Sequence, residues 1–295
     1  MKIASILPYK ENYTPKGAGA VSLWVNDFMK FSKYKKDIMV FGSSKPNKYL
    51  SKNYTNIKLN RINSKLYSST KEYLDKIIIH LKKEVYDLVE IHNRPIMLDK
   101  LVKNVNSKFV LYFHNDPRSM KGAKTPRERL SLLEKANKII FISNWVKQKF
   151  FEGLEFSDHN KTEIIYHSIN PIKKISKKKK QIIFVGKLNE AKGYDLFCDA
   201  VSDILDKHPD WNACSAGDEK RFSPFKTHKK HFNLGLLSHK KTLKMFEQSE
   251  IAVIPSRWEE PFGRTSLESS SRGCATIISK NGGLPLRISS KLFLF

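Results

Sequence analysis

The sequence of 295 residues is long enough for two domains of ordinary size, each with its own core. Hydrophobic residues make up 40% of the chain and charged residues 28%, which is typical of a globular protein and excludes a disordered one. No apolar run approaches the roughly 18 residues that a membrane-spanning helix needs. The opening residues, Met1 to Pro8, predict a first strand rather than a signal peptide.

The net charge of +25 comes mostly from lysine, which is dispersed through nearly every segment, whereas arginine is scarce and not clustered. A lysine-rich genome, an anionic membrane surface and nucleic acid are three alternative explanations of this charge. The sequence has no known DNA-reading motif and no aromatic platform, so we expect no nucleic-acid partner. Three isolated cysteines, Cys198, Cys214 and Cys274, lack metal-ligand spacing and fit a reduced cytoplasm.

In the first half of the chain, short apolar runs alternate with segments of helical periodicity. The predicted strands cover residues 2–7, 37–41, 57–59, 88–91, 109–113, 139–142 and 164–166. The predicted helices cover residues 21–31, 70–83, 126–136 and 144–151. Such alternation predicts a doubly wound α/β layer with a mainly parallel sheet.

Two features of this half point to a ligand. Gly17-Ala18-Gly19 lies between the first strand and the first helix, where glycine serves either a tight turn or the approach of backbone to a phosphate. His92 and His114 each follow a central strand, and ligands collect at the carboxyl ends of parallel strands. Either histidine could instead cap its strand; we interpret His92 as such a cap and His114 as a functional residue.

A lysine- and serine-rich segment marks the predicted domain boundary, because a run of like charges cannot pack into a core. We predict a first domain at residues 1–171, a linker at 172–181 and a second domain at 182–295. The four lysines from Lys177 to Lys180 are interpreted as solvated linker, with a membrane-surface contact as the alternative. Beyond them, strands are predicted at 182–185, 211–216, 232–234, 251–254 and 275–278, and helices at 194–207, 238–248 and 264–272.

Three polar segments of the second half follow the carboxyl ends of strands and should therefore converge. They are Lys187 with Lys192, Gly217-Asp218, and the stretch from Glu260 to Glu268 that enters a helix. Paired lysines beside a helix N-terminus can neutralise a pyrophosphate, although surface charge is the plain alternative. Together these segments predict a nucleotide-sugar pocket.

The sequences Phe184 to Gly193 and Pro255 to Glu268 resemble those of retaining glycosyltransferases of family 4. Glu260 and Glu268 match the family's signature of two glutamates separated by seven residues. The resemblance implies the α/β GT-B fold, in which two doubly wound Rossmann-like domains face each other across a cleft. It also implies transfer of a hexose from a UDP- or GDP-sugar to a glycan or lipid-linked acceptor, with retention of anomeric configuration.

The resemblance assigns roles to residues of both halves. The implied catalytic residues are His114 near the reacting carbon, Glu260 on the donor-sugar hydroxyls and Lys192 on the leaving diphosphate. The implied donor-binding residues are Gly17, Gly19, Lys187, Lys192, Gly217, Glu260, the amides of Phe262 and Gly263, Arg264 and Thr265 over the diphosphate, and Glu268 on the ribose. Such enzymes usually need no metal or other cofactor, and front-face attack assisted by the leaving phosphate is the expected mechanism.

The resemblance also implies a setting. We expect a cytoplasmic enzyme of cell-envelope polysaccharide or lipopolysaccharide synthesis, with peripheral contact to the anionic inner membrane. Acceptor choice is expected in the loops at residues 12–17, 94–98 and 116–124.

Two departures from the family pattern leave alternatives open. Lys187 stands where the family usually has arginine, which keeps the charge but loses bidentate geometry. After Gly282-Gly283-Leu284-Pro285, the family's closing helices have no counterpart in residues 286–295. The chain is therefore expected to be a shortened working enzyme, with a non-catalytic, truncated nucleotide-sugar-binding remnant as the alternative.

Overall fold

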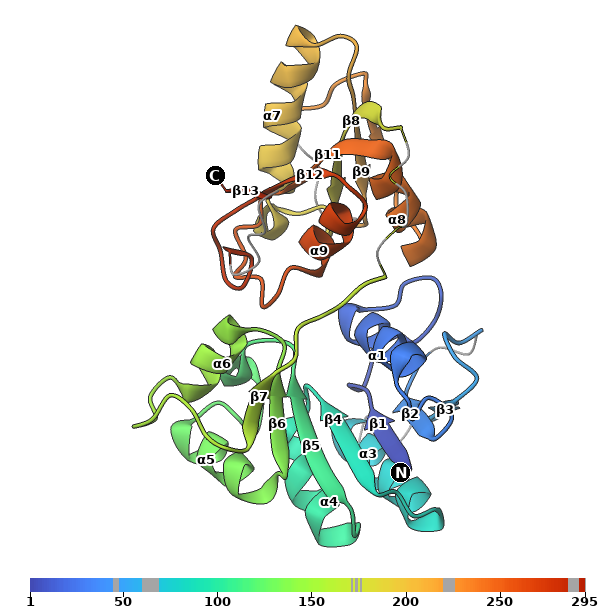
Figure 1. The fold of residues 1–295 in the computed structure, drawn as a ribbon, viewed down its shortest axis with the longest axis vertical. Coiled ribbons are helices and arrows are strands. Elements are labelled where there is room, and N and C mark those ends of the chain that lie inside the picture. Colours follow the sequence, from blue (N-terminus) through green and yellow to red (C-terminus); the bar gives the residue numbers. More distant parts are fainter. Residues whose placement is uncertain are drawn as a thin grey trace. The chain divides into compact units, whose positions relative to one another are not determined.

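The computed structural model describes residues 1–44, 48–59, 69–170, 172, 175, 177–219, 226–285 and 292–294. The chain divides into two compact units, Met1–His167 and Ser168–Phe295, each built on its own parallel sheet (Figure 1). The prediction of two parallel α/β layers is confirmed.

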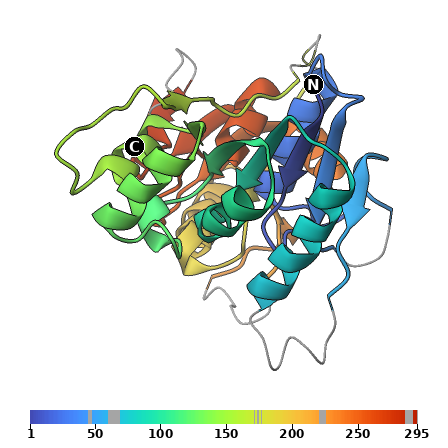
Figure 2. The same cartoon turned by 90° about the horizontal axis from the view of Figure 1, so that it is seen from below.

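The first unit contains a seven-stranded sheet in the order β3-β2-β1-β4-β5-β6-β7, with every pair parallel. Its strands are β1 Ile3–Ile6, β2 Ile38–Gly42, β3 Tyr54–Asn56, β4 Leu88–His92, β5 Lys108–Phe113, β6 Lys138–Phe141 and β7 Thr162–Ile164. Its helices are α1 Ala20–Phe31, α3 Ser69–Lys83, α4 Leu98–Asn104, α5 Pro126–Lys135 and α6 Asn144–Phe151, with short 3-10 turns at Pro95–Met97 and Pro117–Ser119. Helix α1 covers one face of the sheet and α3 and α4 the other (Figure 2).

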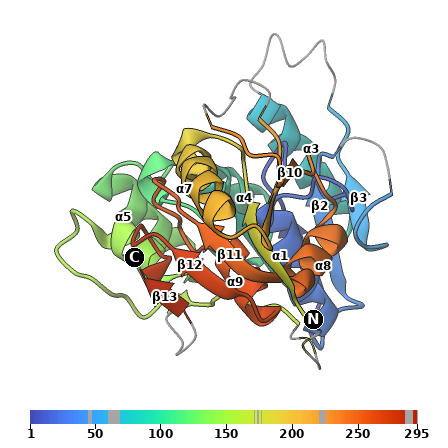
Figure 3. The same ribbon diagram turned by 90° about the horizontal axis from the view of Figure 1, so that it is seen from above.

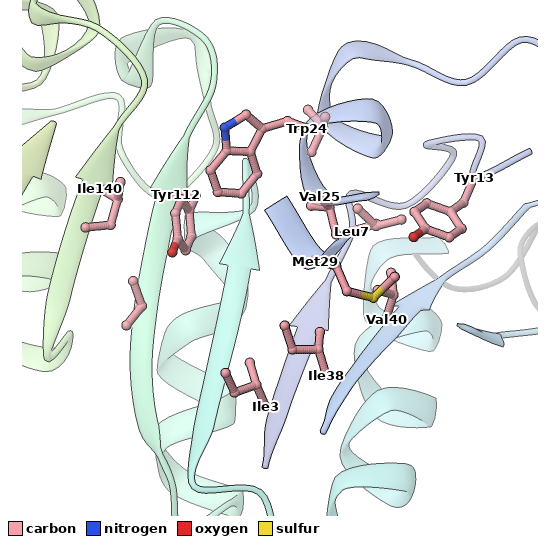
Figure 4. Close-up of a cluster of buried hydrophobic side chains, with 12 residues drawn as sticks. Ile3, Leu7, Tyr13, Trp24, Val25, Met29, Ile38, Val40, Tyr112 and Ile140 are labelled. Carbon is pink, nitrogen blue, oxygen red and sulfur yellow. The ribbon is translucent and has the colours of Figure 1, made fainter. Parts of the chain in front are cut away.

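The α1 face of this sheet is an apolar layer. Figure 4 shows Trp24 of α1 directed at Tyr112 of β5, and Met29 of α1 beside Val40 of β2. Because successive strand residues alternate between faces, one strand supplies side chains to both layers. The order of the strands places β1 beside β4 at the centre, so the chain turns back across the sheet at that point.

The second unit contains a six-stranded parallel sheet in the order β10-β9-β8-β11-β12-β13. Its strands are β8 Lys179–Val185, β9 Asn212–Ala216, β10 His231–Asn233, β11 Ser249–Ile254, β12 Ala275–Ile278 and β13 Leu292–Leu294. Its helices are α7 Tyr194–Lys207, α8 His239–Gln248 and α9 Arg264–Ser271, with a 3-10 turn at Glu190–Lys192. Helix α7 packs on one face, and α8 and α9 lie on the other (Figure 3).

The structure corrects several predicted elements. The third strand lies at Tyr54–Asn56 rather than 57–59, and the predictions contained neither α4 nor β13. Within the predicted linker, Lys179 and Lys180 already belong to β8. The residues of the linker at 173, 174 and 176 lie outside the described part of the chain.

Lys178 is the clearest correction to the predicted solvated lysine run. Its Nζ donates to four backbone carbonyls, those of Phe246, Glu247, Ser249 and Arg272, at 2.9–3.2 Å. These carbonyls lie at the ends of α8 and α9, where a helix presents unsatisfied acceptors and partial negative charge. Lys178 therefore joins two helix ends and is a structural residue.

Candidate functional site

The candidate site lies at the carboxyl edge of the second sheet, between β8 and β11. These two strands are neighbours at the centre of the sheet although they are far apart in sequence. The connections that leave them run to opposite sides, which creates the point where open α/β sheets bind ligands. The β8 loop, residues 186–193, carries Lys187 and Lys192, and the β11 loop, residues 255–263, carries Glu260.

The structure brings Lys192 and Glu260 into direct contact. Lys192 Nζ lies 2.5 Å from Glu260 Oε1, and Ser256 Oγ donates to the same oxygen at 3.2 Å. Both charged side chains are partly exposed, at 29% for Lys192 and 17% for Glu260, so each can still be reached by a ligand. A cation and a carboxylate thus stand side by side where a diphosphate sugar needs one for its phosphates and the other for its hydroxyls.

Contacts of backbone and side chains join the β11 loop to the β8 loop and to the start of α7. Trp258 N donates to Ala191 O at 2.9 Å, and Arg257 forms a two-pronged ion pair with Asp195 at 2.6 Å. Gly193 has a φ of +70°, and a Cβ there would come within 2.0 Å of Pro255 O. Only glycine permits this approach, so the Lys192–Glu260 pair sits on a fixed frame.

A second frame supports the β11 loop from the turn after β12. Gly282 has a φ of +62°, and a Cβ there would meet Glu260 O at 2.4 Å and Glu260 N at 2.6 Å. Gly283 N donates to Glu260 O at 2.5 Å, and Asn281 Nδ2 donates to Ser256 O at 2.8 Å. The turn therefore presses backbone directly against the backbone of Glu260, a role that the sequence analysis did not assign to these residues.

Glu268, the second glutamate of the pair, is buried inside α9. Its Oε1 accepts from Arg264 Nε at 2.7 Å and lies 2.8 Å from His239 Nε2. Burial acts to raise the pKa of Glu268, but the hydrogen bond from His239 and the charge of Arg264 outweigh it and hold the pKa below its ordinary value. The carboxylate is therefore ionised and held in place. His239 was missed because a histidine at a helix start carries no sequence signal of its own.

The Arg264 side chain is held inside the second unit by Glu268. Its Nε is bound to Glu268 one turn further along the same helix, and the side chain is buried. The i, i+4 spacing makes this pairing the nearest one for the guanidinium. The predicted contact of Arg264 with the diphosphate stays a prediction.

The remaining predicted donor-site residues lie around the same edge. Lys187 is exposed and forms no ion pair among the described residues. Gly217 follows β9, with a Cβ position only 1.7 Å from Gly186 O, so the two loops touch. Phe262 is buried, Gly263 is the N-cap of α9 at a φ of +80°, and Thr265 is half-buried in its first turn.

In the first unit, the predicted glycine loop is closed by an acidic side chain. Glu11 Oε1 accepts from Ser22 N at 3.1 Å, and a Cβ on Gly19 would meet that oxygen at 2.2 Å. Burial raises the pKa of Glu11, although the hydrogen bonds from Ser22 oppose it. Gly17 has a φ of +82°, which favours glycine. The Glu11 side chain thus lies at the start of α1 beside Gly19, and the predicted approach of Gly19 to a phosphate stays a prediction.

His92 and His114 form a buried pair at the ends of β4 and β5. His92 Nδ1 lies 3.0 Å from His114 Nε2, and His92 Nε2 lies 2.9 Å from Ser5 Oγ and 3.8 Å from Glu90 Oε2. Burial, with His92 and His167 nearby, holds the pKa of His114 well below its usual value, so its ring is neutral.

The Glu90 carboxylate favours the proton of His92 on Nε2, so that His92 Nδ1 accepts from His114 Nε2–H. This arrangement leaves His114 Nδ1, which has no partner among the described residues, as a hydrogen-bond acceptor. The His92 side chain thus holds a neighbouring ring rather than only capping its strand. The ring of Trp24 lies edge-on to the ring of His114, with 5.2 Å between the centroids. Only 5% of the His114 surface is exposed.

The two parallel sheets are those of the GT-B fold, and comparisons with solved structures support this fold. A solved structure of Anabaena Alr3699/HepE in complex with UDP and glucose has a TM-score of 0.71 at 15% identity and covers 100% of this chain and 85% of that one. Trehalose-6-phosphate synthase OtsA has a TM-score of 0.69 at 14% identity and covers 100% and 88%. The predicted fold class is confirmed.

Sequence comparisons show which proteins the chain is similar to. Residues 167–291 match the family described as glycosyl transferases group 1. Two curated proteins of Bacillus subtilis (strain 168) are each 24% identical: spore coat protein SA, over 97% of this chain and 82% of the relative, and putative glycosyltransferase YtcC, over 96% and 76%. Residues of the second unit are thus similar to group 1 glycosyltransferases, and the resemblance stated from the sequence is confirmed at this level. The narrower assignment to family 4 stays a prediction.

The described residues form neither a membrane-spanning helix nor a cluster of metal ligands. Within the described ranges, no helix is both long and apolar enough to cross a bilayer. In the same part of the chain, no three His, Cys, Asp or Glu side chains gather as a metal site would require.

Proposed function

We propose that this chain transfers a hexose from a UDP- or GDP-sugar to a glycan or lipid-linked acceptor, with retention of anomeric configuration. The observation that carries the proposal is the contact between Lys192 and Glu260 at the edge of the second sheet. The backbone on either side of this contact is fixed by the close approaches at Gly193 and Gly282. The group 1 match covers this entire region. Structures of the similar protein HepE hold UDP or UDP-glucose, which supports a nucleotide sugar as the donor.

The proposed roles follow from the side-chain chemistry. Lys192, joined by Lys187, would neutralise the diphosphate and the charge that develops on it as it leaves. Glu260 would exchange its contact with Lys192 for hydrogen bonds from the sugar hydroxyls. Glu268, ionised and held by Arg264 and His239, would accept from the ribose hydroxyls. The neutral His114 would accept a hydrogen bond from the donor sugar through Nδ1.

We propose front-face attack assisted by the leaving phosphate, the mechanism that the resemblance to retaining glycosyltransferases implies. We further propose metal-independent catalysis. The setting would be the cytoplasmic side of the inner membrane, with peripheral contact through the basic surface. We also propose a role in cell-envelope polysaccharide or lipopolysaccharide synthesis, the setting that the family resemblance implies.

A donor screen tests this function. Thermal unfolding is recorded with a series of UDP- and GDP-sugars, since a ligand that binds only the folded chain raises its stability. We expect one nucleotide series to stabilise the wild-type chain and the Lys229→Met control, in which an exposed lysine before β10, at the opposite edge of the sheet, is neutralised. Lys192→Met should lose the stabilisation. If no nucleotide sugar stabilises the wild-type chain, the proposed function is wrong.

Transfer and retention are tested with the donor found in this way. The chain is incubated with the donor and with a membrane extract as the source of acceptor, and the anomeric configuration of the new linkage is read by NMR. An α-linked donor should give an α-linked product, and Glu260→Gln should give none. An inverted linkage would refute retention while leaving the donor assignment intact.

A further inference from the structure

The first unit contains a cavity lined in part by the loops at residues 94–98 and 116–124, in which acceptor choice is expected. Its volume is about 570 Å³, and it lies at the carboxyl edge of the first sheet, beside the loops that follow β1, β4 and β5. Leu74, Met97 and Met120 give it apolar walls, and Lys71, Arg94 and Lys121 bring three positive charges to it. No carboxylate is among the described residues that line it.

The cations come from three different elements. Lys71 belongs to α3, Arg94 follows β4, and Lys121 follows the turn at Pro117–Ser119. Neither Arg94 nor Lys121 forms an ion pair with a described residue, although many lysines of this chain do. A phosphate has several terminal oxygens, so it can accept from donors that converge from different directions.

The cavity walls are set by backbone geometry. Gly122 has a φ of +90°, and a Cβ there would lie 2.8 Å from the backbone of Ile96, so the two loops touch. Asn93 adopts a φ of +52°, which is uncommon for a residue other than glycine and is typical of functional sites. The buried guanidinium of Arg129 donates to Ala123 O and Lys124 O at 3.0 and 2.8 Å. The cavity is therefore preformed.

The cavity adjoins His114. Asn93, which lines it, accepts from the backbone N–H of His114 at 2.7 Å, and Asn115, also in the lining, follows His114 directly. A molecule in the cavity would therefore lie beside the histidine to which the proposed function assigns the donor sugar.

We propose that this cavity binds the acceptor and that the acceptor carries a phosphate group, held by Arg94 and Lys121 with Lys71 alongside. The assignment of the bound molecule as the acceptor rests on the proposed function. The assignment of a phosphate site rests only on the geometry of the cavity. The phosphate belongs either to a lipid headgroup or to a free phosphorylated sugar, and both present the same oxygens to the three cations.

Binding to the full chain tests the proposal in two arms. In the first, glucose 6-phosphate and neutral glucose are titrated by calorimetry. In the second, the chain is sedimented with phosphatidylcholine vesicles with and without phosphatidic acid. The variants are Arg94→Gln, Lys121→Gln and the control Lys108→Gln, an exposed lysine at the opposite end of β5. Each variant removes one charge, so a general effect of the basic surface would appear equally in all three.

We expect the control to bind like the wild-type chain, and Arg94→Gln and Lys121→Gln to bind at least about tenfold more weakly in one arm. Loss in the glucose 6-phosphate arm identifies a free phosphorylated sugar, and loss in the vesicle arm identifies a lipid headgroup. Binding that is absent in both arms, or equal in all three variants, overturns the proposal. UDP and GDP are titrated separately into the wild-type chain, and failure of both refutes the donor assignment but not the phosphate cavity.

Discussion

Substitution of Gly282 by alanine should damage the donor site without touching any functional side chain. The added Cβ would lie 2.4 Å from Glu260 O and 2.6 Å from Glu260 N. Real Cβ atoms essentially never approach another atom within 3.0 Å, so the Glu260 backbone must retreat by at least about 0.6 Å, and the Lys192–Glu260 contact moves with it. A misplacement approaching 1 Å can cost about 100-fold in rate, so we expect transfer to fall by about 10- to 100-fold. The strained φ of +62° should cost a further 1–2 kcal/mol or so of stability.

Gly235→Ala separates the clash from the backbone strain. Gly235 has the same φ of +62°, but a Cβ there has nothing within 4 Å. The control should therefore show the loss of stability, measured by urea unfolding, and keep its affinity for the donor nucleotide sugar. Equal donor affinity and equal transfer rates in the two variants would refute the inference that the turn after β12 positions Glu260.

Three other predictions concern the rest of the molecule. Lys178→Met should lower the free energy of unfolding by about 2 kcal/mol, because four carbonyls at helix ends lose their donor; a change within about 0.5 kcal/mol would contradict that role. The folded-state pKa of Glu268 is depressed, so its stabilisation is present at neutral pH and lost as the pH falls below about 4. Thermal unfolding of Glu268→Gln should therefore depend less on pH in that range than the wild type, and an equal dependence would refute this. Nitrogen-15 NMR should show His114 as the Nε2–H tautomer in the wild-type chain and a mixture in His92→Phe; an Nδ1–H form in the wild type would overturn the assignment.

The fold was predictable because strands and helices alternate with clear periodicity. The helices α1, α3 and α7 were each predicted within one residue at either end. Helix α4 was missed because it is short and follows Pro95, so its signal resembles that of a loop. β13 was missed because three apolar residues at the end of the chain define no period.

The contact between Lys192 and Glu260 was within reach of sequence reasoning, since loops that leave neighbouring parallel strands at their carboxyl ends converge. What the sequence could not supply was the long-range support. Glu11 closes the start of α1, and Gly282 abuts the Glu260 backbone from the turn after β12. Lys178 looked like part of a solvated charge run, although its ammonium group joins two helix ends. Such contacts depend on tertiary geometry, which no local pattern encodes.

The central claim is that Lys192 binds the diphosphate of the donor and Glu260 binds its sugar. One calorimetric comparison tests this claim. The nucleoside diphosphate of the donor series and the complete nucleotide sugar are each titrated into the wild-type chain, Lys192→Met, Glu260→Gln and the Lys229→Met control. We predict that Lys192→Met weakens both ligands, whereas Glu260→Gln weakens only the nucleotide sugar, by about tenfold or more. Equal weakening of both ligands by Glu260→Gln would contradict the assignment of Glu260 to the sugar.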